Sequence, residues 1–232
     1  MRYIYLLLIL ICYNCNNERV LQLPQIENAD ITEVLDVSPT YVFYDETQSD
    51  STLLNRKNLI STTNWLVNID KRLTLRQAIP HIKFLQDKKR NAELHKNKNA
   101  KNYFTCNDTS ISNLGFIEFT DVYYEFSEPV DKSLDLLKLL PNDLYENFPS
   151  KDGFLELPIE INTDNKTELK NEIIKYIEIL ELSISDEMKI TGFSLVLYFE
   201  ENLSFQDYIS IKSQLEKLST DKVRIGTNEF IY

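Results

Sequence analysis

The chain has 232 residues and a formal net charge of −11, with 43% hydrophobic and 26% charged residues. This balance is typical of a globular protein, and the length suits one large or two small domains. The acidic balance argues against nucleic-acid binding, which needs a basic surface. The glycines (Gly115, Gly153, Gly192 and Gly226) are too scattered for a phosphate- or dinucleotide-binding loop. Two histidines and three scattered cysteines predict neither a metal site nor a cofactor.

The first fifteen residues have the pattern of an export signal. Met1–Arg2 gives a short positive start, and Ile4–Cys12 is an apolar run of nine residues, whereas a transmembrane helix needs about twenty. Polar sequence follows at once, which predicts a secretory signal peptide over residues 1–14. The cysteine at its end resembles the lipidated cysteine of bacterial lipoproteins. We therefore expect lipidation at Cys15, with Cys12 as the alternative, or else an ordinary cleaved signal with two incidental cysteines.

The rest of the chain divides by composition into four parts. Residues 15–38 are polar and are predicted to be a tether. Residues 39–140 and 154–232 are predicted to form a first and a second module, and residues 141–153, rich in proline and polar side chains, a linker between them. The fold class that we expect is α/β, with one or two small strand–helix–strand modules.

The first module opens with strand and helix signals. Tyr41–Tyr44 is a compact aromatic and β-branched run that predicts a strand, and Thr52–Ile60 is a candidate hairpin partner. The sequence Thr74–Gln77 has the form of a capping box, followed by apolar residues at helical spacing. Because Pro80 falls inside this pattern, we expect a kink or a helix that begins near Ile79.

The segment Lys71–Lys101 carries ten lysine or arginine residues and two acidic ones. It predicts either contact with an acidic partner or a solvated helix face and loop. Beyond it, Tyr103–Cys106 reads as a strand, Gly115–Phe126 is ambiguous between strand and helix, and Ser133–Leu140 is a leucine-rich helical piece. This part of the chain therefore gives weaker predictions than the part that follows.

The second module has clearer patterns. Two strands are predicted from apolar patterning, an alternating one at Leu155–Ile161, which Pro158 pushes toward an edge, and a fully buried one at Phe193–Phe199. A helix is predicted over residues 168–182, and a second helix follows a cap at Ser204. A short strand at Lys222–Ile225 completes the module.

A weak internal repeat appears when the chain is shifted by 92 positions. The shift places Ser112 on Ser204 and Phe116 on Tyr208, so that a strand, an acidic turn, a capping serine and an amphipathic segment coincide. If this duplication exists, Gly115–Phe126 is helical despite its β-rich composition.

Leu195–Tyr208, with its helix and the closing Lys222–Ile225, resembles the periplasmic domain of the ExbD/TolR biopolymer-transport family, which has a strand, an acidic turn, a helix and a final strand in this order. The resemblance implies the periplasmic fold and a role in binding a protein partner or peptidoglycan. It does not imply proton coupling, because the family's transmembrane aspartate has no counterpart: no Asp or Glu precedes Glu18.

Catalytic groups are sparse in this sequence. Cys106 with His81 or His95 could form a nucleophile–base pair, but a lone cysteine beside a strand is more often a small buried hydrophobe. The acidic pairs Glu200–Glu201 and Asp45–Glu46 suit turns better than acid–base chemistry, because neighbouring strand residues face opposite sides. We therefore predict no catalytic residue.

The function that we expect is that of a membrane-tethered, non-enzymatic lipoprotein on the periplasmic side of the cell envelope, as a monomer or an oligomer. It would bind an envelope protein or peptidoglycan. One alternative is an exported enzyme such as a hydrolase, which predicts that Cys106, His81 and Asp108 converge in one cleft. Another is a small-ligand-binding lipoprotein, which predicts a large apolar pocket between the two halves.

Overall fold

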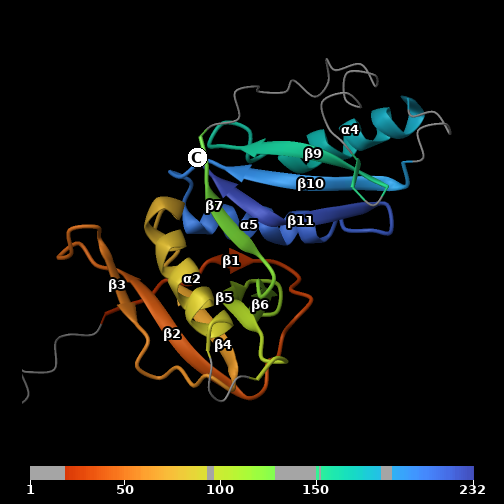
Figure 1. Cartoon of the computed structure of the whole chain (residues 1–232). Helices are drawn as coiled ribbons and strands as arrows, with labels where there is room; N and C mark the ends of the chain where they lie inside the picture. The colour runs from red at the N-terminus through yellow and green to blue at the C-terminus, as the bar shows by residue number, and fades with distance from the viewer. Residues whose placement is uncertain (1–18, 93–96, 129–149, 152, 184–189) are drawn as a thin grey trace, which may run out of the picture.

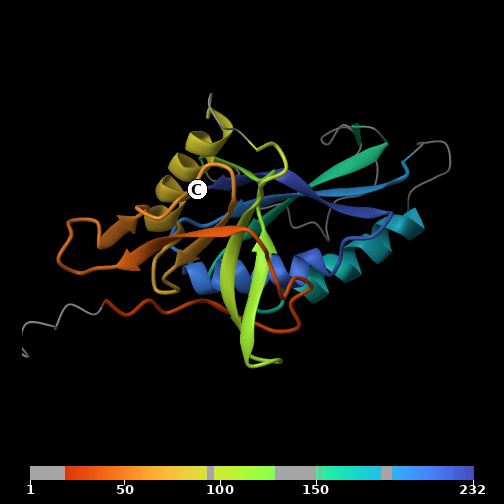
Figure 2. The same cartoon turned by 90° about the horizontal axis from the view of Figure 1, so that it is seen from below.

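The computed structural model describes residues 19–92, 97–128, 150–151, 153–183 and 190–232. Within these ranges the predicted α/β class is confirmed: two sheets are accompanied by three helices (Figures 1 and 2). The predictions for the signal peptide, for lipidation at Cys15 or Cys12, and for a helix at Ser133–Leu140 lie outside the described residues.

The first sheet is built mainly from parallel strands. Its order is β1-β5-β4-β2-β3, and β6 pairs with β5 along the edge that faces away from β4. Strands β1, β5, β4 and β2 are parallel, whereas β3 and β6 are antiparallel to their neighbours. The predicted strands around Phe43 and Phe104 and the predicted hairpin are confirmed. The bounds are β1 (Gln25–Ile26), β2 (Val37–Tyr44), β3 (Thr52–Asn55), β4 (Asn64–Ile69), β5 (Asn102–Asp108) and β6 (Asn113–Glu118).

The second sheet has the order β7-β11-β10-β9-β8, with all neighbours parallel except β8. Helices α4 and α5 connect β9 to β10 and β10 to β11, and both lie on the same face of the sheet (Figure 2). The strands and helices predicted here are confirmed. The bounds are β7 (Tyr123–Phe126), β8 (Ser150–Lys151), β9 (Phe154–Ile161), α4 (Leu169–Ser183), β10 (Gly192–Phe199), α5 (Phe205–Glu216) and β11 (Val223–Ile231).

Burial along the strands follows the apolar pattern of the sequence. Strand β9 alternates between buried and half-buried residues, and β10, which lies in the middle of its sheet, is almost wholly buried. Strand β8 pairs only with Phe154–Leu155, so Pro158 lies beyond it, where a missing N–H disrupts no ladder on that side of β9.

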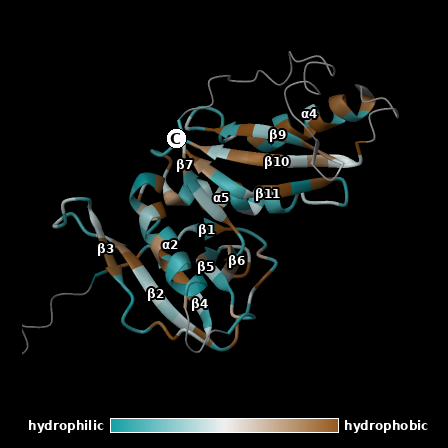
Figure 3. Cartoon of the chain, in the orientation of Figure 1, coloured by the Kyte–Doolittle hydropathy of each residue, from teal (hydrophilic) through white to brown (hydrophobic). Residues whose placement is uncertain are grey.

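Helix α2 (Leu75–Arg90) begins at the predicted capping box. The side chain of Thr74 accepts from the backbone N–H of Gln77, and the side chain of Gln77 accepts from the backbone of Thr74. In Figure 3 the ribbon of α2 alternates between hydrophobic and hydrophilic residues, as expected of a helix with one buried face. The expected start near Ile79 is wrong. Pro80 lies inside the helix at an exposed position, where water can bind the carbonyl oxygen that lacks its N–H donor.

Aromatic side chains join the two halves of the molecule. Phe104 on β5 stacks on Phe119 with ring centroids 3.8 Å apart. It also meets Phe205 and Tyr208 of α5 edge-on, at 5.3 and 6.2 Å. These side chains are all buried, so one hydrophobic core extends from the first sheet to the helix of the second.

The predicted repeat at 92 positions is wrong. Gly115–Phe126, which it required to be helical, contains strands β6 and β7 and the turn between them. Strand β7 also pairs with β11 of the second sheet, although the predicted first module contains it. Strand β7 therefore belongs to the second sheet, and residues 141–149 of the predicted linker lie outside the described residues.

The predicted tether packs against the first sheet over part of its length. Strand β1 pairs with the end of β5, and Ile31 forms a bridge to Phe116 on β6. The segment lies so close to β6 that a Cβ atom on Gly115 would come within 2.6 Å of the Cβ of Ala29. A glycine at this position is therefore what allows the segment to approach. None of the helices in the described ranges is long and apolar enough to cross a membrane.

Candidate functional site

The two halves contain the same structural unit, at an offset of 130 positions. In the first half β4 leads into the turn Asp70-Lys71-Arg72, a cap at Thr74, helix α2 and strand β5. In the second half β10 leads into an acidic turn, a cap at Ser204, helix α5 and strand β11. At this offset Leu73, Ile79 and Leu85 fall on Leu203, Ile209 and Leu215, all of them buried.

The two units are joined at their helix caps by a reciprocal exchange of hydrogen bonds. The backbone N–H of Leu75 donates to the carbonyl of Leu203 at 2.9 Å, and the N–H of Phe205 donates to the carbonyl of Leu73 at 2.6 Å. Thr74 and Ser204 form an antiparallel bridge between them. An antiparallel bridge has local two-fold symmetry, so the two helices start from equivalent positions and face opposite sheets.

Each helix consequently meets an outer strand of the opposite sheet. Strand β7 lies on the edge of β11 that faces away from β10, and β6 lies on the edge of β5 that faces away from β4. Helix α2 lies against β7, and residues of α5 line a cavity together with residues of β6. We call these places the α2 junction and the α5 junction.

The α2 junction is closed by long side chains that donate hydrogen bonds. The ammonium of Lys83 donates to the carbonyl of Tyr124, and the amide of Gln86 donates to the carbonyls of Phe119 and Val122. In the last turn Arg90 donates to the carbonyl of Val122 at 2.9 Å. Two cations and an amide therefore satisfy the backbone oxygens that this strand and its preceding turn present to the helix.

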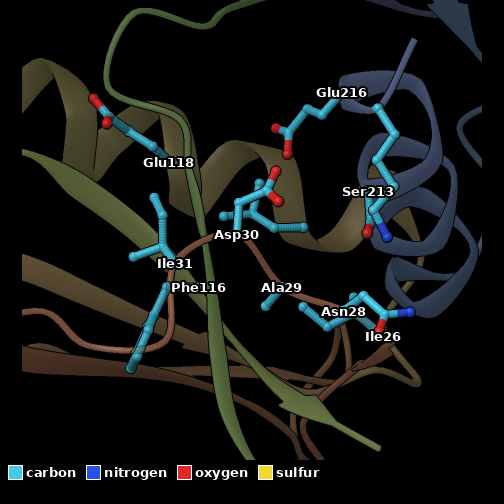
Figure 4. A pocket seen from close by; sticks show the side chains of 11 residues that line it. Ile26, Asn28, Ala29, Asp30, Ile31, Phe116, Glu118, Ser213 and Glu216 are labelled. Atoms are coloured by element: carbon cyan, nitrogen blue, oxygen red, sulfur yellow. The ribbon is translucent and has the colours of Figure 1, made fainter. Parts of the chain in front are cut away.

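The α5 junction is open. Ser213 and Glu216 stand at the positions of Lys83 and Gln86, and α5 ends at Glu216, one turn earlier than its counterpart. A hydroxyl and a carboxylate replace the ammonium and the amide, so the long donor groups are missing. A cavity of about 160 Å³ lies here, between α5, β6 and the segment that follows β1 (Figure 4).

The cavity is acidic. The carboxylates of Asp30 and Glu216 face each other across it, whereas Glu118 points away from both (Figure 4). Glu118 is paired with Lys101 at 2.7 Å, but neither Asp30 nor Glu216 has a hydrogen bond or ion pair through its carboxylate within the described part of the chain. Desolvation raises the pKa of Glu216, and the charge of Asp30 adds to this rise against the opposing charge of Lys212.

A larger groove of about 390 Å³ continues from this cavity along α5 and β1. The two share Ile26, Asn28, Ser213 and Lys217. The groove is lined mainly by amide and hydroxyl side chains, including those of Gln206, Ser210, Gln214 and Thr109. The groove is therefore polar, and the cavity mixes carboxylates with the apolar side chains of Ile26, Ile31 and Phe116, whereas a small-ligand lipoprotein predicts a large apolar pocket.

The candidate nucleophile does not share a cleft with the candidate base. Cys106 is fully buried on β5, and desolvation raises the pKa of its thiol. His81 on α2 is hydrogen-bonded to Thr52 on β3, at the opposite edge of the sheet, and desolvation lowers its pKa. Asp108 accepts from Ser110 and from the backbone of Ala29, and these bonds lower its pKa to about 2. His95 lies outside the described residues.

The acidic pairs bond to turns and to arginine side chains. Glu200 accepts from Thr163, and Glu201 accepts from Arg76 across the junction of the two halves. Asp45 accepts from Thr47 in its own turn. Within the described ranges, no group of three or more His, Cys, Asp or Glu side chains could hold a metal ion.

Much of the basic segment Lys71–Lys101 is used inside the protein. Besides the α2 junction, Lys89 donates to the carbonyl of Lys101 and to the amide oxygen of Asn102, and desolvation lowers its pKa to about 8. Arg72 forms an ion pair at 2.8 Å with Asp70, whose side chain is buried. These contacts explain a large part of the local positive charge without an external acidic partner.

Comparison of the chain with family models, curated proteins and solved structures gives no significant match. The α5 junction was not among the site residues predicted from the sequence. The signal that could have found it is the alignment at 130 positions, in which Lys83 and Gln86 of one helix fall on Ser213 and Glu216 of the other.

Proposed function

We propose that the protein is a membrane-tethered, non-enzymatic lipoprotein of the cell envelope that binds a protein or cell-wall partner, in the manner of the periplasmic part of ExbD/TolR-like transport proteins. The observation that carries this proposal is the repeated unit of strand, turn, capped helix and strand, found at Thr74 and again at Ser204, where the turn is acidic. This is the order of elements on which the resemblance rests.

The arrangement of polar groups supports binding more than catalysis. Cys106 is buried with a raised pKa, and the candidate base His81 is hydrogen-bonded to Thr52. A thiol that stays protonated is a poor nucleophile. The open α5 junction, by contrast, offers a polar groove and two carboxylates that have no ion-pair partner among the described residues.

Lipidation and partner binding are tested together on the full-length chain. Wild type, Cys15→Ser and Cys12→Ser are expressed in a bacterial host with radioactive palmitate, and the membranes are then dissolved in detergent. We expect label in wild type and Cys12→Ser but not in Cys15→Ser, and a specific envelope component that purifies with the labelled protein. Absence of label from all three, together with no retained component, would contradict the proposal.

A further inference from the structure

We propose that the α5 junction binds the side chain of a lysine from an extended segment of a partner protein. The inference rests on the proposed function and names the chemistry of the partner. It begins from a difference between two equivalent places in one chain, of which one is filled by cations and the other is open.

The α2 junction shows what fits between such a helix and such a strand. There the ammonium of Lys83 donates to the carbonyl of Tyr124 on the outer strand. The guanidinium of Arg90 donates to the carbonyls of Thr120 and Val122 in the turn before that strand. At the α5 junction the equivalent of Lys83 is Ser213, and the cavity of about 160 Å³ occupies the corresponding place. A cationic side chain from outside would restore the arrangement that the first half makes from its own residues.

The charges at the α5 junction favour such a group. Asp30 and Glu216 are both exposed and face each other (Figure 4), and neither carboxylate has an ion-pair partner among the described residues. Of the nearby cations, Lys212 is bonded to Glu229, and Lys217, which lines the cavity and the groove, donates to the backbone carbonyl of Glu27. Two adjacent carboxylates repel each other, and a cation between them converts this repulsion into two charge-assisted hydrogen bonds.

The groove beside the cavity selects a peptide rather than a small amine. Its amide and hydroxyl side chains can donate to carbonyls and accept from N–H groups, as the backbone of an extended peptide requires. Gln206 already does this within the chain, because its side chain exchanges hydrogen bonds of 2.8 and 2.9 Å with the backbone of Gln25. A peptide could therefore place its basic side chain in the cavity and its backbone along the groove.

The test uses full-length protein in detergent and a capped pentapeptide with one central lysine, titrated by calorimetry. The comparison ligands are the same peptide with norleucine at the centre, and spermidine. The variants are Glu216→Gln and Asp30→Asn. The control is Glu178→Gln, which makes the same charge change at an exposed position of helix α4. A further variant, Ser213→Lys/Glu216→Gln, gives α5 the residue types that α2 has at the positions of Lys83 and Gln86, and the new lysine fills the cavity.

We expect saturable binding of the lysine peptide to wild type and to Glu178→Gln, and none of the norleucine peptide. Loss of one charge-assisted bond should weaken binding about tenfold in Glu216→Gln or Asp30→Asn, and Ser213→Lys/Glu216→Gln should bind no peptide while keeping its cooperative unfolding. Equal binding to all variants, no binding to wild type, or spermidine binding as strong as that of the peptide would overturn the inference. A partner retained in the palmitate experiment would still support the proposed function in those cases.

Discussion

Thr74 and Ser204 form an isolated antiparallel bridge between the two halves, and each caps the helix that follows it. One pair of residues thus starts both helices and joins the two halves. Because the caps are equivalent, the helices present equivalent faces to opposite sheets. The two faces differ in their side chains, since Ser213 and Glu216 of α5 stand at the positions of Lys83 and Gln86 of α2.

Removal of either cap should destabilise the protein. Thr74→Ala and Ser204→Ala each lose an acceptor for a backbone N–H of the first helical turn, and each should lower the free energy of unfolding by about 1 kcal/mol. Urea unfolding followed by circular dichroism measures this change. Thr62→Ala, at an exposed position, is the control and should change stability by less than about 0.5 kcal/mol; equal losses in all three variants would contradict the role of the caps.

The buried pair of Lys212 and Glu229 should be sensitive to the loss of one partner. Their charged atoms lie 2.5 Å apart, and Tyr208 donates to the second oxygen of Glu229. Lys212→Met should cost about 3–5 kcal/mol, because it leaves a buried carboxylate without its counter-charge. The double variant Lys212→Met/Glu229→Gln should be more stable than Lys212→Met in chemical unfolding, and a double variant that is less stable would contradict this account.

The segment after β1 should detach when Gly115 gains a side chain. A Cβ atom there would lie 2.6 Å from the Cβ of Ala29 and 3.3 Å from that of Asp108, so Gly115→Ala should loosen residues 27–31. Limited proteolysis should then cleave within these residues faster than in wild type. Gly115→Ala/Ala29→Gly removes the closest contact and should restore much of the protection; cleavage unchanged in Gly115→Ala would show that the segment tolerates the collision.

Neutralising Glu216 should stabilise the fold near pH 7. Desolvation and Asp30 raise its pKa above the ordinary value, opposed by Lys212. Glu118 is paired with Lys101, and Lys217 donates to the backbone carbonyl of Glu27. A carboxyl with a raised folded-state pKa gives its stability at low pH and loses it as the pH rises through that pKa. Glu216→Gln should therefore melt at a higher temperature than wild type at pH 7, with the difference vanishing below the ordinary pKa of glutamate. A variant less stable at pH 7 would show that the carboxylate has a partner in the fold.

The sequence predicted most of the regular structure, because local signals are strong where they coincide with burial. The capping box at Thr74, the alternating strand at Leu155–Ile161 and the apolar strand at Phe193–Phe199 each combine a pattern with a matching environment. Pro80 was misread because propensity alone does not show that its side of the helix faces solvent.

The arrangement of the halves was not predictable from local patterns. The β-rich composition of Gly115–Phe126 gave the correct element, but a repeat chosen at the wrong offset favoured a helix. The polar segment around Gln25 carries little hydrophobic signal, and it is ordered by pairing with a distant strand. The α5 junction likewise depends on residues from three separate parts of the chain, which only the fold brings together.

Zero-length coupling of carboxylates to amines in native membranes tests the central claim of partner binding most directly. A carbodiimide links a carboxylate only to an amine that touches it, and mass spectrometry identifies both residues. The account predicts a link from Asp30 or Glu216 to a lysine of another envelope protein, and its loss in Ser213→Lys/Glu216→Gln but not in Glu178→Gln. Links to a partner from other carboxylates alone would place the contact elsewhere on the protein, and no link to any partner would contradict the binding role itself.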